Sequence, residues 1–538
     1  MTVSRPVRNR TIGLAVGLGL SAVLVFGAAT PAFAGPLATP SSGPVAGGTT
    51  VSLGAATLGF TQIAQGGNTG YGLSGDGHIY AWGDNGSAEL GDGSTAPSST
   101  PVRVLRGAIP VGVTITQIAA GSASGYALGS NGAVYAWGAN DDGQLGDGSK
   151  ATRNEPVAVV LSGLPAGVTV LRIAAGAMDA YAIGSDGNIY SWGYGFDGEL
   201  GDGGTALSTT PVVVAEGARP AGVGFTQVAA GDGMAFGIGT DGQVYSWGWN
   251  VTGALGTGDL MNQDVPTALS AGAIPVGVEI TRVASGQEGG YALGDDGKVY
   301  AWGSDLFGDL GDGGSTDQDV PVAVVAGDIP GGVTITAIAA GSSSAYAVGS
   351  DGHIFSWGNG GNGQLGNGSG AESNTPVLVS EGEIPSGVTL TSVSGGYHSA
   401  IALGSDDRVY GWGDDNSGDL ADGTTTQRET PVLGANAVVT RVTFGGVAGT
   451  DVIDPPGVTT VVTPPHAGGA VAVVVSGTMK GGVTSGVATS RTIPAAFTFV
   501  GDLPVTGAAF PWWLLVVGCA ALLSGVLLVT RRRAPVQK

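Results

Sequence analysis

Residues 126–148 read YALGSNGAVYAWGANDDGQLGDG, and this pattern recurs seven times along the chain. Its most regular part is an aromatic-x-Trp-Gly motif, whose tryptophans are Trp82, Trp137, Trp192, Trp247, Trp302, Trp357 and Trp412. Each step between motifs is 55 residues, without any insertion. Equal spacing of this kind indicates one structural unit repeated seven times.

Each unit has the pattern of short β-strands. Asn131-Gly132 lies between two apolar segments and is a strong signal for a tight hairpin turn. In the second unit, the four predicted strands lie near residues 117–121, 126–129, 134–137 and 156–160. Four short strands per unit fit the radial blades of a propeller, which leaves only short, protected edges. A linear solenoid needs distinct terminal repeats, and the first and last units look like the others.

The repeated text resembles the regulator of chromosome condensation repeat, whose fold is a seven-bladed β-propeller. The resemblance implies a propeller over residues 57–436, in which the repeated Trp and Tyr side chains pack within and between blades. It also implies candidate roles. Secreted bacterial propellers of this repeat type include inhibitors of β-lactamase, and eukaryotic relatives act in nucleotide exchange on a small GTPase at chromatin.

The segments on either side of the propeller resemble two parts of one domain. Residues 38–56 and 437–500 are similar to the opening and the remainder of an immunoglobulin-like IPT/TIG domain. We therefore expect an all-β chain, with the propeller inserted into an early loop of a small β-sandwich. Insertion is reasonable because we expect the first and last propeller strands to meet in its closing blade, so that its ends lie close together. The alternative is an N-terminal linker followed by a truncated sandwich.

The N-terminus has the features of a secretory signal. Three arginines precede an apolar run that starts at Ile12, and Ala32-Phe33-Ala34 offers small residues at both positions required for cleavage. The prediction is a signal peptide over residues 1–34, with Ala32 and Ala34 read by the peptidase and Gly35 starting the exported protein. A permanent membrane anchor is the alternative.

The C-terminus resembles a cell-wall sorting signal of Gram-positive bacteria. A pentapeptide, residues 503–507, is followed by an apolar segment, residues 508–530, and then by Arg531, Arg532 and Arg533. The apolar segment is long enough to span a bilayer as a helix, with the arginines holding its cytoplasmic end. The pentapeptide consists of Leu503, Pro504, Val505, Thr506 and Gly507.

The resemblance to a sorting signal implies that the protein is a substrate. A sortase would attack the carbonyl carbon of Thr506, release residues from Gly507 onward, and join Thr506 to a peptidoglycan amine. The helix predicted within residues 503–538 would contact the membrane only before this step. The sequence thus predicts a secreted protein covalently attached to the cell wall.

Charge and composition exclude several classes of function. The two removed segments contain seven basic and no acidic residues, so their loss takes the net charge from −22 to −29. Such a protein should be repelled by nucleic acid, which argues against the chromatin role. The single cysteine, Cys519, lies in the removed segment. The four histidines have no catalytic or metal-ligand spacing, so we expect no enzyme activity, cofactor or metal centre.

Many of the aspartates precede a glycine, as is typical of tight turns. Asp147, Asp202, Asp312 and Asp422 occupy one repeat position, and calcium binding there stays open, although turn chemistry explains these residues adequately.

The units differ most in the loop that follows Trp-Gly. Blades one, two, six and seven have polar residues there, whereas blades three, four and five have large apolar or aromatic ones. These are Tyr194, Phe196, Trp249, Val251, Leu306 and Phe307. Adjacent exposed aromatic residues usually mark a binding site. The alternative is that they fold back onto their own blades.

Together these features predict a wall-anchored surface protein whose propeller serves as a binding or adhesion module for an extracellular protein or glycan. A propeller that inhibits or scaffolds a secreted enzyme is the second hypothesis, and nucleotide exchange is the third.

Overall fold

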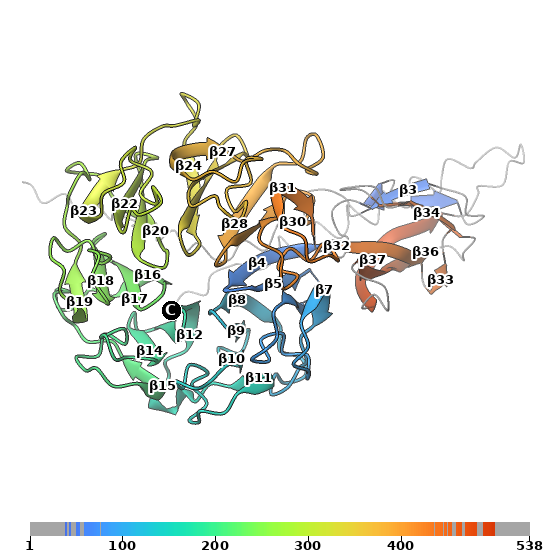
Figure 1. Cartoon of the computed structure of the whole chain (residues 1–538). Coiled ribbons are helices and arrows are strands. Elements are labelled where there is room, and N and C mark those ends of the chain that lie inside the picture. The colour runs from blue at the N-terminus through green and yellow to red at the C-terminus, as the bar shows by residue number, and fades with distance from the viewer. Residues whose placement is uncertain are drawn as a thin grey trace, which may run out of the picture.

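The computed structural model describes residues 38–39, 42–44, 50–53, 59–75, 77–434, 436–444, 446–448, 450–453, 459–464, 469–480 and 488–500. Seven four-stranded antiparallel sheets are arranged in a ring, seen in Figure 1. The predicted all-β class and seven-bladed propeller are therefore confirmed. Within the described ranges, no helix has the length and apolar character needed to cross a membrane. The predicted signal peptide, sorting motif and C-terminal helix lie outside these ranges.

Each blade consists of four consecutive strands, the first of which lies next to the central axis. Blade one contains β4 (Phe60–Gly66), β5 (Thr69–Ser74), β6 (Ile79–Gly83) and β7 (Ser98–Arg103). Blade two contains β8 (Ile115–Ala120), β9 (Ser124–Gly129), β10 (Val134–Gly138) and β11 (Arg153–Ala158), followed by the short 3-10 helix η1 (Leu161–Gly163). Blade three contains β12 (Val170–Ala175), β13 (Asp179–Gly184), β14 (Ile189–Gly193) and β15 (Ser208–Val213). Blade four contains β16 (Phe225–Ala230), β17 (Met234–Gly239), β18 (Val244–Gly248) and β19 (Gln263–Ala268).

The remaining blades repeat the same order. Blade five contains β20 (Ile280–Ser285), β21 (Gly289–Gly294), β22 (Val299–Gly303) and β23 (Gln318–Ala323). Blade six contains β24 (Ile335–Ala340), β25 (Ser344–Gly349), β26 (Ile354–Gly358) and β27 (Ser373–Leu378). Blade seven contains β28 (Leu390–Gly395), β29 (Ser399–Gly404), β30 (Val409–Gly413) and β31 (Arg428–Leu433).

The repeated tryptophan joins each blade to the one before it. In blade two the register between β10 and β11 shifts between Ala136 and Gly138, around Trp137, and such a bulge re-aims a side chain. The Trp137 indole N–H donates to the backbone carbonyl of Glu89 in blade one, at 2.7 Å. Because the ring is buried, this hydrogen bond is shielded from water. The equivalent bond recurs around the ring from Trp192, Trp247, Trp302, Trp357 and Trp412.

The accepting carbonyl also binds a tyrosine of its own blade. The Tyr126 hydroxyl donates to the carbonyl oxygen of Gln144 at 2.8 Å, and Trp192 of blade three donates to the same oxygen at 2.8 Å. Tyr71, Tyr181, Tyr291 and Tyr346 make the same bond in their own blades. The tyrosine thus fixes the loop that receives the next blade, and the aromatic rings fill the space between blades.

The expectation that the first and last strands share a closing blade is wrong. Blades one and seven are each complete, with four consecutive strands of their own. The ring is instead closed by bonds between blades: Trp82 donates to the carbonyl of Asp419 at 2.9 Å, and the Phe60 amide donates to the carbonyl of Asp407 at 2.8 Å. Phe60 also packs against Trp82 and Tyr80. A shared blade is unnecessary because this junction has the same tryptophan bond as the other six.

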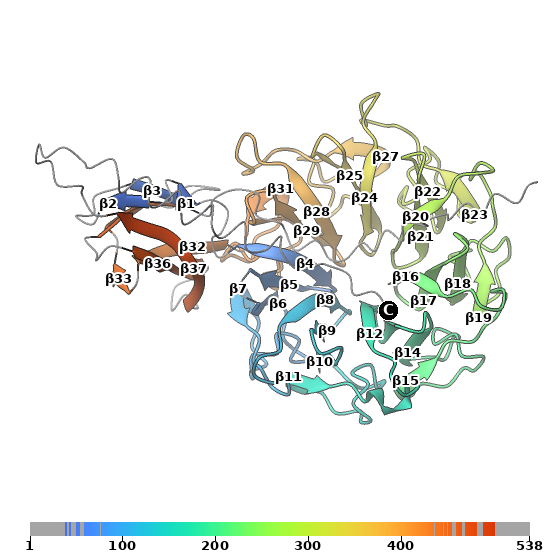
Figure 2. The ribbon, with the colours of Figure 1, turned by 180° about the vertical axis from the view of Figure 1, so that it is seen from behind.

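A second group of strands lies beside blades one and seven, as Figures 1 and 2 both show. One sheet has four strands in the order β1-β3-β35-β34, and the other has five in the order β2-β37-β36-β32-β33. Strands from before the propeller pair with strands from after it: β3 is antiparallel to β35, and β2 is parallel to β37. The bounds are β1 (Ala38–Thr39), β2 (Ser42–Pro44), β3 (Thr50–Leu53), β32 (Asn436–Phe444), β33 (Val447–Ala448), β34 (Thr450–Ile453), β35 (Thr459–Val462), β36 (Gly469–Lys480) and β37 (Ala488–Val500).

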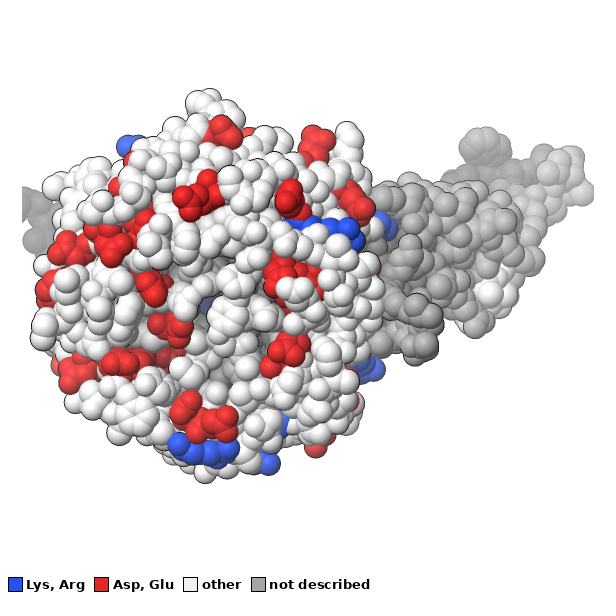
Figure 3. Space-filling view, in the orientation of Figure 1, with Lys and Arg blue, Asp and Glu red and all other residues white. Residues whose placement is uncertain are grey.

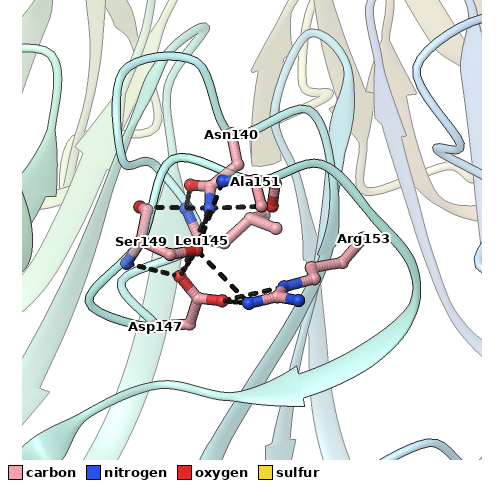
Figure 4. Close-up of polar contacts among 6 residues, drawn as sticks. All are labelled: Asn140, Leu145, Asp147, Ser149, Ala151 and Arg153. Atoms are coloured by element: carbon pink, nitrogen blue, oxygen red, sulfur yellow. Dashed lines mark hydrogen bonds and ion pairs between the residues drawn. The ribbon is translucent and has the colours of Figure 1, made fainter.

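A buried amide organises the long loop after Trp-Gly, as Figure 4 shows for blade two. The Asn140 side chain is fully buried, and its Oδ1 accepts the amide of Leu145 at 3.0 Å. Its Nδ2 donates to the carbonyls of Ser149 and Ala151 at 3.2 and 3.0 Å. Since one side chain satisfies groups from both halves of the loop, the loop has a defined shape despite its length.

Aspartate replaces this asparagine in blades five and seven, as Asp305 and Asp415. Asp415 accepts the amides of Leu420 and Thr426 through its two oxygens, at 3.0 and 3.1 Å. Burial raises its pKa to about 6, and the neighbouring charge of Asp422 adds to this shift.

One further repeat position has buried acids in alternate blades. It is Glu89, Glu199, Asp309 and Asp419 in blades one, three, five and seven, and Gln144, Ala254 and Gln364 in the others. Burial raises the pKa of Glu199 and Asp309 to about 7 and that of Asp419 to about 8. These carboxyl groups therefore bind protons more tightly in the folded chain than in the unfolded one.

We predict that Asn140→Ala destabilises the chain, because the Leu145 amide loses its buried acceptor and two carbonyls lose a donor. The free energy of unfolding should fall by about 2–4 kcal/mol, measured by chemical denaturation. Asn140→Asp is the matched control and should cost less, since Asp305 and Asp415 hold the equivalent loops. Equal losses for the two variants would contradict this role of the side chain.

We predict that mild acidification stabilises the fold. A carboxyl group whose pKa is raised by folding contributes most stability below its unfolded pKa of about 4 and loses it as the pH rises through its folded pKa. The folded values of about 6 to 8 for Asp415, Glu199, Asp309 and Asp419 place this loss between pH 4 and 8. The unfolding midpoint should therefore be higher at pH 5.5 than at pH 8, as measured by calorimetry. Asp419→Asn should flatten this profile, and a midpoint that falls steadily from pH 8 to 5.5 would refute the assignment.

Candidate binding site on one face of the ring

Two loops of every blade lie on the same face of the propeller. In a four-stranded meander, the connection between the first and second strands and that between the third and fourth leave the same end of the sheet. In blade three these are the loop before β13 and the long loop before β15. They are joined by a hydrogen bond from the Tyr194 amide to the carbonyl of Met178, at 2.9 Å. The face is thus built from linked loops on a rigid ring.

A cavity of about 220 Å³ opens on this face between blades three, four and five. Its walls include the aromatic rings of Tyr194 from blade three and Trp249 from blade four. The Trp249 amide donates to the carbonyl of Gly233 at 2.8 Å, which fixes its loop in the same way as that of Tyr194. Two of the six predicted patch residues therefore lie in one site.

Five carboxylates line the cavity: Asp179, Asp197, Glu199, Asp232 and Glu288. No lysine, arginine or histidine lines it, and within the described ranges none of the five forms an ion pair. The face of the ring shown in Figure 3 has acidic side chains around a central hollow, with basic ones mostly near the outer rim. The cavity thus gathers five carboxyl groups in one site together with Tyr194 and Trp249.

The carboxylates are only partly satisfied by the protein. Glu199 accepts the amide of Asp197 at 2.9 Å through Oε2, and Gln287 donates to Asp232 at 3.1 Å. Asp179 is 2% exposed, and its Oδ2 lies 2.9 Å from the hydroxyl oxygen of Tyr181, which donates its proton to the carbonyl of Glu199. Its other oxygen, Oδ1, has no hydrogen-bond partner among the described residues.

Burial and mutual repulsion shift the acidity of this group. Burial raises the pKa of Asp179 well above its ordinary value, and the charges of Glu199 and Asp232 raise it further. Burial also raises the pKa of Glu199 to about 7, with added contributions from Asp197 and Asp232. Tyr194 has a raised pKa through burial and the charges of Asp197 and Glu199. Each shift has the sign expected for a site that lacks positive charge.

The other predicted patch residues lie outside the cavity walls. Phe196, Val251 and Leu306 are 54%, 59% and 72% exposed, whereas Phe307 is half-buried. Phe196 stacks edge-on against Tyr194, with ring centroids 5.0 Å apart. The alternative in which all six residues fold back onto their blades does not describe the three exposed side chains.

The five carboxylates of the cavity are not identified from the sequence, because acidic residues in loops rich in aspartate resemble turn formers. A comparison by repeat position contains the signal. Asp179 occupies a position that is Ser124, Ser344 and Ser399 in blades two, six and seven. Glu288 occupies one that is Met178 and Gly233 in the two preceding blades.

The four aspartates considered for calcium are separated, one in each of four blades. Asp147 accepts Arg153 at 2.6 Å and Asp422 accepts Arg428 at 2.7 Å, so an arginine already balances each charge. Asp202 and Asp312 accept backbone amides two residues ahead, as turn-forming aspartates do. In the part of the chain that the structure describes, no three His, Cys, Asp or Glu residues are grouped to hold a metal.

The mouth of the central channel adjoins the cavity on the same face. All seven blades contribute to its walls, largely with Gly, Ala and Ser, and Asp232 and Gln287 line both spaces. The Tyr397 hydroxyl of blade seven donates to Ser122 of blade two at 2.7 Å, so a side chain lies at this mouth.

Comparison with known proteins identifies the repeated unit. A family model described as the regulator of chromosome condensation (RCC1) repeat matches residues 76–128, 131–183, 186–238, 241–293, 296–348 and 351–403, which together exceed half of the chain. A second model of the same repeat matches residues 60–88, 115–144, 225–254 and 335–364.

Individual relatives share this region. The ultraviolet-B receptor UVR8 of Arabidopsis thaliana is 34% identical over 316 residues, which cover 59% of this chain and 68% of the receptor. The regulator of chromosome condensation of Mus musculus is 27% identical over 62% of this chain and 79% of its own length. The crystal structure of Prp20p from Saccharomyces cerevisiae superposes with a TM-score of 0.57, at 22% identity, over 75% of this chain and 92% of that one. The chain therefore belongs to the family of regulator of chromosome condensation repeat propellers.

Proposed function

We propose that the protein is a binding module displayed on the cell surface, with the loop face of blades three to five as its contact surface. The observation that carries this proposal is the cavity lined by Tyr194 and Trp249, together with the exposed Phe196 that packs against Tyr194. Exposed aromatic residues beside a pocket are typical of a protein interface. A receptor and a regulator among the relatives fit a binding or regulatory role.

The ends of the sequence support display outside the cell. Residues 1–34 have the order of a cleavable signal, and residues 503–538 have the pentapeptide, apolar segment and basic tail of a sorting signal. We propose covalent attachment to peptidoglycan through Thr506. The acidic charge fits this location better than binding to nucleic acid, because a chain at −29 would be repelled by phosphates.

We further propose that the two sheets beside the propeller form one immunoglobulin-like sandwich. The pairing of β3 with β35 and of β2 with β37 supports this arrangement, since strands from both sides of the propeller contribute to both sheets. Two connections would hold the propeller more firmly than one linker. The sandwich would then serve as the base on which the binding face is presented.

Inhibition or scaffolding of a secreted enzyme is the second candidate function. The exposed Phe196, Val251 and Leu306 favour it, because they give the face an apolar rim suited to a folded partner. Both candidate functions use the same face, and the nature of the captured partner distinguishes them.

We predict that the triple variant Tyr194→Ala, Trp249→Ala and Phe307→Ala loses partner binding. The purified full chain is applied to an array of matrix proteins, glycans and secreted enzymes, and the affinity for each bound partner should fall at least about tenfold. Val111 and Val276 are highly exposed in the loops of the opposite face, so Val111→Ala with Val276→Ala is the matched control. Unchanged binding by the triple variant, with an unchanged unfolding midpoint, would exclude this face.

We predict that Thr506→Ala moves the protein from the wall fraction to the membrane fraction of the producing cell. The substitution alters the residue whose carbonyl the sortase would attack, so the apolar segment should stay attached. Fractionation and immunoblotting measure the effect, with Val505→Ala, at the variable position of the motif, as control. Recovery of the intact wild-type chain from the cytosol would overturn the proposed export.

A further inference from the structure

We propose that the cavity between blades three, four and five binds a cationic side chain, arginine or lysine, of a protein partner. The inference rests on the proposed function, because it assigns the chemistry of the partner at the same face. Charge complementarity supports it: carboxylates from three blades line the cavity beside Tyr194 and Trp249, and no basic side chain among the described residues lines it.

The buried oxygen of Asp179 is the first independent observation. Its side chain is 2% exposed, lines the cavity, and has an Oδ1 with no partner in the described part of the chain. Unpartnered buried polar atoms are rare and require an explanation. In blades two and six a serine occupies this position and bonds the neighbouring tyrosine, Ser124 with Tyr126 at 3.1 Å and Ser344 with Tyr346 at 2.9 Å. A serine can therefore make this tyrosine contact without adding a charge.

Glu199 provides the second observation, again by comparison with the equivalent residue of blade two. Its Oε2 accepts the amide of Asp197 at 2.9 Å. In blade two Gln144 accepts the equivalent amide of Asp142 at 3.0 Å, so a neutral side chain is sufficient for the loop. The negative charge of Glu199 is thus not needed for the fold. Its raised pKa, caused by burial and by nearby carboxylates, indicates that a positive charge in the cavity would be stabilised.

The aromatic rings and the size of the cavity define the ligand. Tyr194 and Trp249 line the cavity, and aromatic rings attract cations through cation–π contacts, in which tryptophan is the strongest partner. The space of about 220 Å³ is below the usual range for drug-sized ligands. It suits one guanidinium or ammonium group and its methylene stem. A cationic side chain would therefore enter the cavity, while the rest of the partner covers the exposed Phe196 beside Tyr194.

Calorimetric titration of the purified full chain at pH 8 tests the proposal with small probes. Nα-acetyl-arginine amide and Nα-acetyl-lysine amide present one positive charge each, and Nα-acetyl-citrulline amide has the shape of the arginine probe without its charge. We expect at least one cationic probe to bind and the citrulline probe to bind at least about tenfold more weakly, since a charged partner strengthens each hydrogen bond. Equal binding of all three probes, or binding of none, would overturn the proposal.

The double variant Asp179→Ser with Glu199→Gln locates the probe. It installs the residues of blade two and should weaken binding of the cationic probe at least about tenfold. Glu89→Gln is the matched control, because Glu89 has the same loop contact in blade one, outside the cavity. Retained affinity in a folded double variant would overturn the assignment. If that variant does not fold, the comparison of arginine and citrulline probes on the wild-type chain still decides.

Failure of this inference is separable from failure of the proposed function. A chain that captures partners through its aromatic face but binds no cationic probe refutes the inference alone. A chain that binds the cationic probe but remains in the cytosol refutes surface display and leaves the cavity assignment standing.

Discussion

The hydrogen bond from each tryptophan indole to a carbonyl of the preceding blade is the interaction on which the ring depends. It is short, buried and repeated at every junction, including the one between blades one and seven. The same carbonyl accepts a tyrosine hydroxyl in five blades. These bonds therefore also fix the long loop after Trp-Gly. A blade that lost this contact would lose its orientation toward its neighbour and the position of its loops.

Because every junction between blades uses the same tryptophan bond, loop residues that take no part in it can differ from blade to blade. The buried Asn140 position, held by Asn or Asp in five blades, keeps the loops in shape, while the residues beside it vary. Blades three to five use this freedom for aromatic residues and for carboxylates such as Asp179 and Glu288. The neutral residues at the equivalent positions of blade two show that the charge is an addition to the fold and not a part of it.

Most of the fold follows from the spacing of one motif. A tryptophan every 55 residues meets an equivalent neighbouring blade each time. The strands predicted for the second unit match β8, β9, β10 and β11 within a few residues; they were expected near residues 117–121, 126–129, 134–137 and 156–160. Ring closure was not predictable, because side-chain bonds such as that of Trp82 replace a shared blade. Of the site, Tyr194 and Trp249 were found by their size. Asp179 does not stand out by residue type among the many turn aspartates, and only its difference from the serines at the equivalent positions marks it in the sequence.

The pairing of strands from before and after the propeller has a mechanical consequence. β3 precedes the ring and pairs with β35 in the four-stranded sheet. β32 follows the ring and lies in the five-stranded sheet, in which β2 pairs with β37. A force that pulls the two ends of the chain apart would act along the parallel pair β2 and β37 and would shear their hydrogen bonds before it reached the blades. The loop face of the ring would keep its geometry while these hydrogen bonds bear the tension.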